Sequence, residues 1–283
     1  MSEADRANDA ALGRDERLRG EGVRRFYSDP STVEFYSSYD TLTPAEQHLF
    51  ATYVPPRSRV LDLGVGGGRT TKVLAESAAI YVGVDLEPRM VEACRSQFPH
   101  LDFHALDASD LSQFRDGSFD AVVFSFNGLD CLPTEALRQR CIAECARVLR
   151  EGGVFIVSTH NPRCLFTTLD RSIVRRKSKA LASRLRAQWM AAGINVVAVP
   201  AAWAVVNLRR WRHRLLRRGF WRGVGFLPDP LQPEQTLYAA TPQIAEKEFA
   251  AAGFRTLCRI GGSYPRKPTT LGTDWFYFAL QKT

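Results

Sequence analysis

The pattern of apolar and polar positions between residues 57 and 160 alternates between two periods. The stretches Pro88–Phe98 and Thr134–Leu149 place their apolar residues at helical spacing. Five shorter runs are apolar enough to be buried strands, namely Arg59–Leu63, Ile80–Val84, Leu101–Leu106, Phe119–Phe124 and Val154–Ser158. Regular alternation of strands and helices predicts an α/β fold, with a doubly wound, mostly parallel sheet that helices cover on both faces.

The N-terminal residues do not share this alternation. Residues 1–25 mix acids and arginines without an apolar period, which predicts a mobile leader. Thr43, Pro44 and Glu46 then supply an N-cap, a proline at the first helical position and an acid in the first turn. We therefore expect a helix from about residue 44 to residue 53.

The first predicted strand runs into a glycine-rich turn, Asp62-Leu63-Gly64-Val65-Gly66-Gly67-Gly68, and a helix follows. Glycines let the backbone approach a ligand closely, and a helix N-terminus offers unpaired N–H groups to it. Asp85 ends the second strand, where a carboxylate can accept hydrogen bonds from both hydroxyls of a ribose. Asp107 follows the third strand, where an acid can accept a hydrogen bond from an adenine amino group. Three strand ends thus predict an adenosine-containing ligand.

Two alternatives apply to these positions. The acids, above all Asp107, could instead cap the helices that follow them. A nicotinamide cofactor is the alternative ligand, whereas a Walker phosphate loop is excluded because no Gly-Lys-Ser or Gly-Lys-Thr follows the glycines.

The combined set resembles the class I S-adenosylmethionine (SAM)-dependent methyltransferases. Val60–Gly68 is similar to the D-x-G-x-G-x-G motif of that family, Phe119–Val122 to its fourth strand and Val148–Gly153 to the turn into its fifth. The resemblance covers roughly residues 43–160 and returns at residues 237–281. It implies a seven-stranded sheet with an antiparallel last strand, SAM as methyl donor and S-adenosylhomocysteine as product.

The resemblance also implies the cofactor contacts. The turn glycines Gly64, Gly66 and Gly68 would approach the cofactor, and Asp62 would meet its methionine moiety together with Gly64. The remaining contacts would be Asp85 with the ribose, Leu86 and Met90 with the adenine face, Asp107 and Ala108 with the adenine edge, and Ser125, Phe126 and Asn127 under the sulfonium.

Methyl transfer to a hydroxyl or a protonated amine needs a base that removes a proton. His160 follows the fifth predicted strand and Asp130 follows the fourth, so we predict both as catalytic residues, together with Tyr39. The alternative for His160 is a structural hydrogen bond to its loop, and Tyr39 is equally suited to packing. The predicted substrate-binding residues are Tyr36, Asn161 and Arg163.

Composition and the first residues of the chain indicate the cellular compartment. The chain is 45% apolar and 24% charged, its six cysteines form no C-x-x-C pair, and its first residues are charged where a secretory signal would be apolar. A reduced, cytoplasmic protein follows. A Cys131–His160–Cys164 metal site matches no recognised ligand spacing, so no metal is predicted.

One segment accounts for the net charge of +8. Residues 163–222 contain 15 Lys and Arg but a single acid, Asp170, so the rest of the chain is acidic on balance. Arginines suit carboxylate and phosphate groups, which favours an anionic acceptor. The alternatives are a nucleic acid, a shallow contact with an anionic membrane, or a solvated helix face. The uncharged run Trp189–Leu208 predicts lid helices rather than a membrane span, because the strands on both sides belong to one sheet.

We therefore predict four segments: a leader (1–25), a SAM-binding core with an N-terminal lid helix (26–160), a basic, mainly helical substrate-binding insertion (161–236) and the C-terminal part of the core (237–283). The predicted function is SAM-dependent methyl transfer to an oxygen or nitrogen of a small or medium-sized metabolite. RNA methylation and a non-catalytic SAM-binding scaffold for nucleic acid or an anionic membrane are the alternatives.

Overall fold

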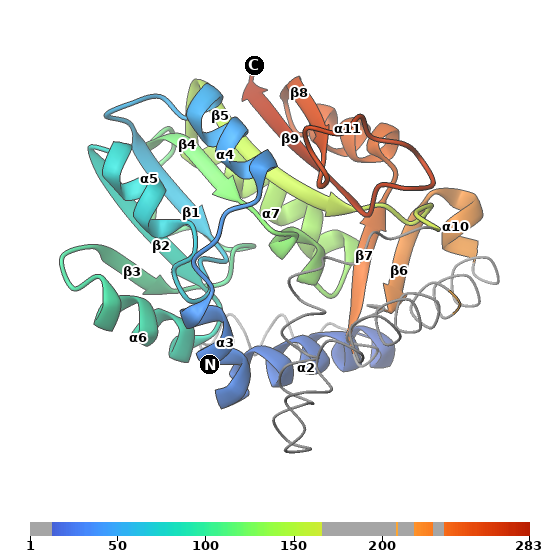
Figure 1. Cartoon of the computed structure of the whole chain (residues 1–283), viewed down its shortest axis with the longest axis horizontal. Helices are drawn as coiled ribbons and strands as arrows, with labels where there is room; N and C mark the ends of the chain where they lie inside the picture. Colours follow the sequence, from blue (N-terminus) through green and yellow to red (C-terminus); the bar gives the residue numbers. More distant parts are fainter. Residues whose placement is uncertain (1–12, 166–207, 209–217, 229–234) are drawn as a thin grey trace, which may run out of the picture.

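The computed structural model describes residues 13–165, 208, 218–228 and 235–283. Its centre is a nine-stranded sheet with the order β3-β2-β1-β4-β5-β7-β6, in which β9 also pairs with β5 and β8 pairs with β9 (Figure 1). The strands are β1 (Arg59–Leu63), β2 (Ile80–Asp85), β3 (Asp102–Ala105), β4 (Phe119–Phe124), β5 (Leu149–His160), β6 (Val224–Pro228), β7 (Thr236–Ala240), β8 (Phe254–Gly261) and β9 (Trp275–Lys282).

Helices lie on both sides of this sheet. They are α2 (Arg14–Ser28), α3 (Pro30–Ser38), α4 (Pro44–Tyr53), α5 (Thr71–Ser77), α6 (Pro88–Gln97), the short 3-10 helix η1 (Gly128–Cys131), α7 (Glu135–Val148), α10 (Arg218–Arg222) and α11 (Pro242–Ala251).

Strands β1 to β5 are parallel, and β9 runs antiparallel to β5 from Val154 to His160. The mostly parallel sheet with an antiparallel last strand is thereby confirmed. Two strands exceed the expected seven: β6 and β7 form a hairpin, and β7 joins β5 through one residue pair, His160 with Ala239. They were missed because they lie in and beside a segment whose pattern predicted mainly helices.

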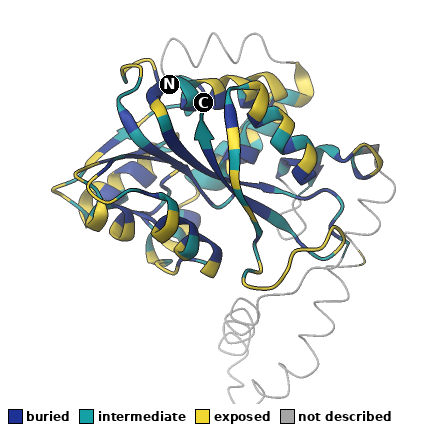
Figure 2. Cartoon of the chain, turned by 90° about the horizontal axis from the view of Figure 1, so that it is seen from above, coloured by how far each residue is buried: buried dark blue, intermediate teal, exposed yellow. Residues whose placement is uncertain are grey.

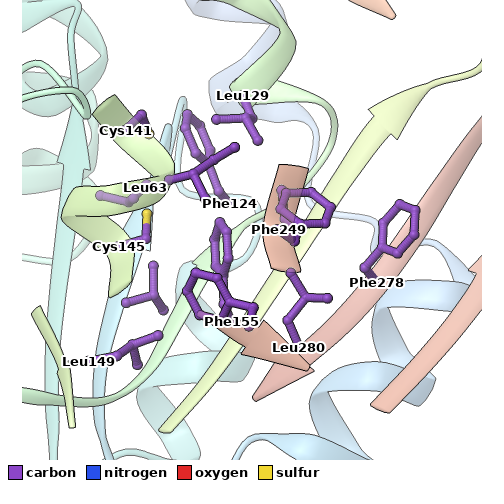
Figure 3. Packing of buried hydrophobic residues seen from close by; sticks show 14 of the residues in the cluster. Leu63, Phe124, Leu129, Cys141, Cys145, Leu149, Phe155, Phe249, Phe278 and Leu280 are labelled. Atoms are coloured by element: carbon purple, nitrogen blue, oxygen red, sulfur yellow. The ribbon is translucent and has the colours of Figure 1, made fainter. Parts of the chain in front are cut away.

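The two faces of the sheet carry two separate cores, because side chains alternate along a strand. Leu61 and Leu63 of β1 pack on the side of α7 and α11, where Cys145 and Phe249 are fully buried (Figure 3). Val60 points to the other side, into the core formed with α4, α5 and α6. Figure 2 shows the buried strands between helices whose outer sides are exposed. The carboxyl ends of the parallel strands are thus held rigidly at one edge.

Helix α4 begins as the sequence predicts. The Thr43 hydroxyl accepts a hydrogen bond from the backbone N–H of Glu46 (3.2 Å), and the Glu46 carboxylate accepts one from the N–H of Thr43 (2.8 Å). We expect Thr43→Ala to lower the free energy of unfolding by about 1 kcal/mol in urea titrations, because an orphan donor loses its partner. Thr43→Ser keeps the hydroxyl and is the control; an equal loss there would show that the cap is not the cause.

The prediction of a mobile leader is wrong over residues 14–25, which belong to helix α2; residues 1–12 lie outside the described residues. The helix is held by its docked face rather than by its own propensity. Val23 is buried, the Arg19 guanidinium lies 4.1 Å from the centroid of the Phe226 ring, and Arg19 Nε donates to the carbonyl of Pro133 (2.9 Å). These partners are over a hundred residues away, so local sequence did not reveal them.

Most of the basic segment 163–222, including the run 189–208 apart from Leu208, lies outside the described residues. The predictions of lid helices and of an anion-binding rim therefore stay predictions, as does the cytoplasmic location. None of the helices in the described ranges combines the length and the apolar character that a membrane crossing requires.

Candidate active site

A cavity of about 690 Å³ lies at the carboxyl ends of β1 to β4. Three of the predicted acids line it, Asp62 after the middle of β1, Asp85 at the end of β2 and Asp107 just past β3. The other predicted cofactor residues that line it are Gly64, Gly66, Leu86, Ala108, Ser125 and Phe126. The topology therefore brings most of the predicted cofactor site to one place, as expected for the switch point of a doubly wound sheet.

A hydrogen bond to Asp85 holds the glycine-rich turn against the end of β2. The backbone N–H of Gly66 donates to Asp85 Oδ2 (2.8 Å), and that of Glu87 donates to Oδ1 (2.9 Å). Gly64 has φ +61°, and a Cβ there would lie 2.7 Å from the Phe124 ring, so this turn position requires glycine. The two hydrogen bonds fix the direction of the Asp85 carboxylate at the edge of the cavity.

Asp62 is a buried acid, and its burial changes the pKa of its carboxyl group. Burial raises the pKa of Asp62 to about 6, against the hydrogen bonds from Thr70 and Tyr81. Both of those hydroxyls donate to Oδ2, at 2.5 and 2.8 Å respectively. Burial of an ionised carboxylate without a partner is unfavourable, so Asp62 is suited to bind a cationic group, such as the ammonium of an amino acid moiety.

A buried ion pair beside the turn was missed by the sequence analysis. Glu46 is fully buried, and its carboxylate accepts two hydrogen bonds from Arg69 (2.6 and 2.7 Å) and one from the Ser125 hydroxyl. Burial alone would raise the pKa of Glu46, but Arg69 and Ser125 bring it below its usual value. In the sequence, only the position of Arg69 directly after the glycines could have indicated this ion pair. Glu46 was explained by its place in the first turn of a predicted helix.

Helices α2 and α3 form the outer wall of the cavity. Gly20, Val23, Arg24, Arg25, Tyr27 and Ser28 line it from α2, and the predicted Tyr36 lines it from α3. The Tyr27 hydroxyl lies 3.8 Å from Cys131 Sγ, and burial raises the pKa of that tyrosine well above its usual value. The spacing of Val23 and Tyr27, four residues apart, was the signal that could have predicted this helix.

The predicted catalytic pair, Asp130 and His160, comes together at the ends of η1 and β5. Asp130 Oδ2 accepts hydrogen bonds from Nδ1 of His160 (2.8 Å) and from its backbone N–H (2.7 Å). Asp130 is fully buried, so it contacts His160 rather than an acceptor, while the His160 side chain is 21% exposed. With Nδ1 bound to the carboxylate, the neutral imidazole has its lone pair on Nε2.

Other predicted residues do not line the cavity. Met90 is 1% exposed and points into the interior beneath α6, and Gly68 packs against Phe98, where an added Cβ would lie 2.8 Å from the ring. Asn127 lies beside His160, its Nδ2 3.4 Å from Nε2. Tyr39 stacks on Phe35 with ring centroids 6.0 Å apart.

Two predicted substrate residues hold loops instead. The side chain of Asn161 is buried and donates to the carbonyls of Thr270 and Thr273, both at 2.8 Å. The Arg163 guanidinium donates to the carbonyls of Phe220 and Trp221. Within the described ranges, no three His, Cys, Asp or Glu side chains form a group that could hold a metal ion.

This sheet order, with a glycine-rich turn after β1 and acids at the ends of β2 and β3, defines a Rossmann-like cofactor-binding domain. Comparison with known families agrees, since residues 61–157 match a family model described as "Methyltransferase domain". A demethylmenaquinone methyltransferase of Beutenbergia cavernae is 31% identical over 180 residues, which is 60% of this chain and 68% of that protein. The chain belongs to the class I SAM-dependent methyltransferase family, and SAM is its cofactor.

Two further comparisons bear on the site. A ubiquinone biosynthesis O-methyltransferase of Xanthomonas campestris is 33% identical over 110 residues, 38% of this chain and 44% of that protein. The 1,6-didemethyltoxoflavin-N1-methyltransferase of Burkholderia thailandensis, solved with S-adenosylhomocysteine bound, shares the fold at a TM-score of 0.56 and 17% identity, over 100% of this chain and 91% of that one. The chain spans half or less of the length of the first curated relatives that it matches.

The residues around the cavity fit SAM. An added Cβ at Gly66 meets no atom within 4 Å, so the turn leaves open space for a ligand beside the carboxylates of Asp62 and Asp85. In this fit Asp62 would hold the methionine ammonium, Asp85 the ribose hydroxyls, and Leu86 one face of the adenine. When bound, SAM supplies a methyl group on an activated sulfonium.

We expect Asp85→Asn to weaken the binding of S-adenosylhomocysteine about 100-fold. Two ribose hydroxyls would lose a charged acceptor, and hydrogen bonds to charged groups contribute about 1.5 kcal/mol or more each. Isothermal titration calorimetry measures the effect. Asp102→Asn, at the exposed start of β3, is the control, and equal affinity for the two variants would remove Asp85 from the cofactor site.

Proposed function

We propose that this protein transfers a methyl group from SAM to an oxygen or nitrogen of a small or medium-sized acceptor, with His160 as the proton acceptor. The observation that carries the proposal is the His160–Asp130 pair at the carboxyl end of β5, described above. Such a pair leaves Nε2 able to take a proton from a hydroxyl or amine while the new bond to the methyl carbon forms. Alignment of the acceptor with the sulfonium supplies the rest of the rate.

Aromatic side chains near His160 support a ring-shaped acceptor. The Trp275 ring lies 6.5 Å from His160 between centroids, Phe126 lies 6.3 Å from Trp275, and Tyr39 lies 6.4 Å from Phe126. All four side chains are partly exposed at the same edge of the sheet. The names of two relatives, which mention menaquinone and ubiquinone, support a quinol-type ring as the first class to test, and the ubiquinone relative is named an O-methyltransferase.

The test is a transfer assay with methyl-labelled SAM and four acceptors of different chemistry: a hydroquinone, an aromatic amine, an aromatic carboxylate and total RNA. We expect label on the hydroquinone oxygen, located by mass spectrometry, with aromatic amine as the other outcome that supports the proposal. Label on a ring carbon, or in RNA alone, would overturn it. Binding of SAM with no transfer to any of the four, or to a fractionated cell extract, would instead favour the non-catalytic scaffold.

A further inference from the structure

The His160–Asp130 pair contacts further charged side chains that are buried behind Asp130. Arg138 of α7 is 1% exposed, and its Nη1 donates to Asp130 Oδ1 (2.9 Å). Its Nε donates to Glu248 Oε2 of α11 (3.1 Å). The four side chains Glu248, Arg138, Asp130 and His160 are called the charge network below.

Buried charges are costly, so this network needs a reason beyond stability. Breaking a buried ion pair is destabilising, but replacing the whole pair by apolar residues is often neutral or favourable. Arg138 stays a cation: burial opposes its charge, yet Asp130 and Glu248 together raise its pKa above the usual value. It therefore holds a full positive charge directly against the carboxylate that orients His160.

We propose that Arg138 and Glu248 are positioning residues that set the proton affinity of His160 through Asp130. The inference rests on the proposed function, in which His160 takes a proton. A buried carboxylate alone would favour the imidazolium form, which cannot act as a base. The positive charge of Arg138 offsets part of that field, and the negative charge of Glu248 in turn moderates Arg138.

The surroundings of His160 contain few other charges in the described part of the chain. Thr159 Oγ1 donates to Asp130 Oδ1 (2.7 Å), which completes the hydrogen bonds of that carboxylate. On the β9 side, Asp274 precedes Trp275, and its Oδ1 accepts a hydrogen bond from the Cys164 thiol (2.8 Å). Tyr238 lies beneath Arg138, whose guanidinium is 4.3 Å from the ring centroid, and its hydroxyl donates to Glu248.

The signs of the expected effects are opposite for the two ends of the network. Arg138→Gln removes a positive charge near Asp130, so the imidazolium becomes more favourable and the pKa of His160 should rise by about one unit. Glu248→Gln removes a negative charge beside Arg138, so the same pKa should fall, by about half a unit because Glu248 is farther away. Arg138→Lys keeps the charge and should restore the parent value.

The measurement is an NMR titration of the full chain labelled at its histidines, with the His160 signal assigned by its loss in His160→Gln. This readout does not depend on activity. Arg140→Gln, an exposed change on the same helix, is the matched control and should leave the His160 pKa unchanged. If Arg138→Gln fails to fold, Glu248→Gln and Arg138→Lys still test the proposal, since Glu248 is 18% exposed and tolerates an isosteric change.

Two outcomes would overturn the network: no movement of the His160 pKa in either neutralising variant, or movement of both in one direction, as a general loosening would cause. A pH–rate profile separates this failure from failure of the proposed function. If the His160 pKa moves with opposite signs but the rate profile does not follow, the network is correct and His160 is not the base. If the His160 pKa and the pKa seen in the rate profile shift by the same amount in each variant, both proposals hold.

Discussion

His160→Gln should lower the rate of methyl transfer by about 10²- to 10⁴-fold and leave the affinity for S-adenosylhomocysteine unchanged. This is the range that a positioned general base contributes, and glutamine cannot take up a proton. Cofactor binding should persist because His160 does not line the cofactor cavity. The expected result is thus a loss in kcat under saturating SAM, measured with methyl-labelled SAM and the acceptor found in the transfer assay.

The chain offers a matched control for this experiment. His104 Nε2 lies 3.0 Å from Asp102 Oδ2, so it is a second histidine–aspartate pair, but it lies on β3 away from η1 and β5. His104→Gln should leave the rate within twofold of the parent, on the order of experimental error. If His160→Gln retained the parent rate across the pH range, methyl transfer would proceed by alignment alone and His160 would have only a structural role.

We expect Arg69→Met to lower the free energy of unfolding by about 3–5 kcal/mol, because it leaves the fully buried Glu46 carboxylate without its cation. The double variant Arg69→Met with Glu46→Gln should recover much of that loss, since the glutamine is neutral. Its amide oxygen can still accept from the Thr43 N–H, and its amide nitrogen can donate to the Ser125 hydroxyl. Urea titration of both variants measures the difference. Arg259→Met, which breaks the exposed pair with Glu246, is the control and should cost less than about 1 kcal/mol.

The same ion pair predicts a dependence on pH. Arg69 and Ser125 lower the pKa of Glu46 in the folded protein below its ordinary value of 4.5. The stability that the pair contributes is therefore complete above that ordinary value and is lost as pH falls through the lowered folded pKa. Stability measured at pH 7 and at pH 3 should show a smaller gap between the parent and the double variant at the lower pH. An equal gap at both values would show that the carboxylate is not the source of the effect.

The parts of the site that could be predicted are those written in contiguous residues. The turn from Asp62 to Gly68 and the acids that end β2 and β3 follow apolar runs directly, so periodicity placed them at one edge of the sheet. Asp130 and His160 were found for the same reason, because each follows a strand. What the sequence did not show was that Asp130 is enclosed and acts on His160 rather than on an acceptor.

The remaining parts depend on contacts between distant segments. Glu46 and Arg69 belong to different elements, and Arg138 and Glu248 are 110 residues apart in the chain. A charged residue on a predicted helix is ordinarily solvated, so Arg138 had no local feature that set it apart from the exposed Arg140. The docking of α2 could not be predicted for the same reason. Its apolar face is narrow, and its partners on β6 and before α7 come much later in the sequence.

The hairpin of β6 and β7 has a consequence for how this chain can diversify. The polypeptide leaves the sheet after His160 and re-enters it at Val224 of β6, whose hairpin partner β7 pairs Ala239 with that same His160. The stretch between His160 and Val224 therefore begins and ends at the same end of the two strands that flank β7. Such a stretch can be lengthened, shortened or exchanged at small cost in closure entropy, without displacing any strand of the cofactor domain. A change in the length of this stretch would therefore leave the glycine-rich turn and the strand ends around the cavity in place.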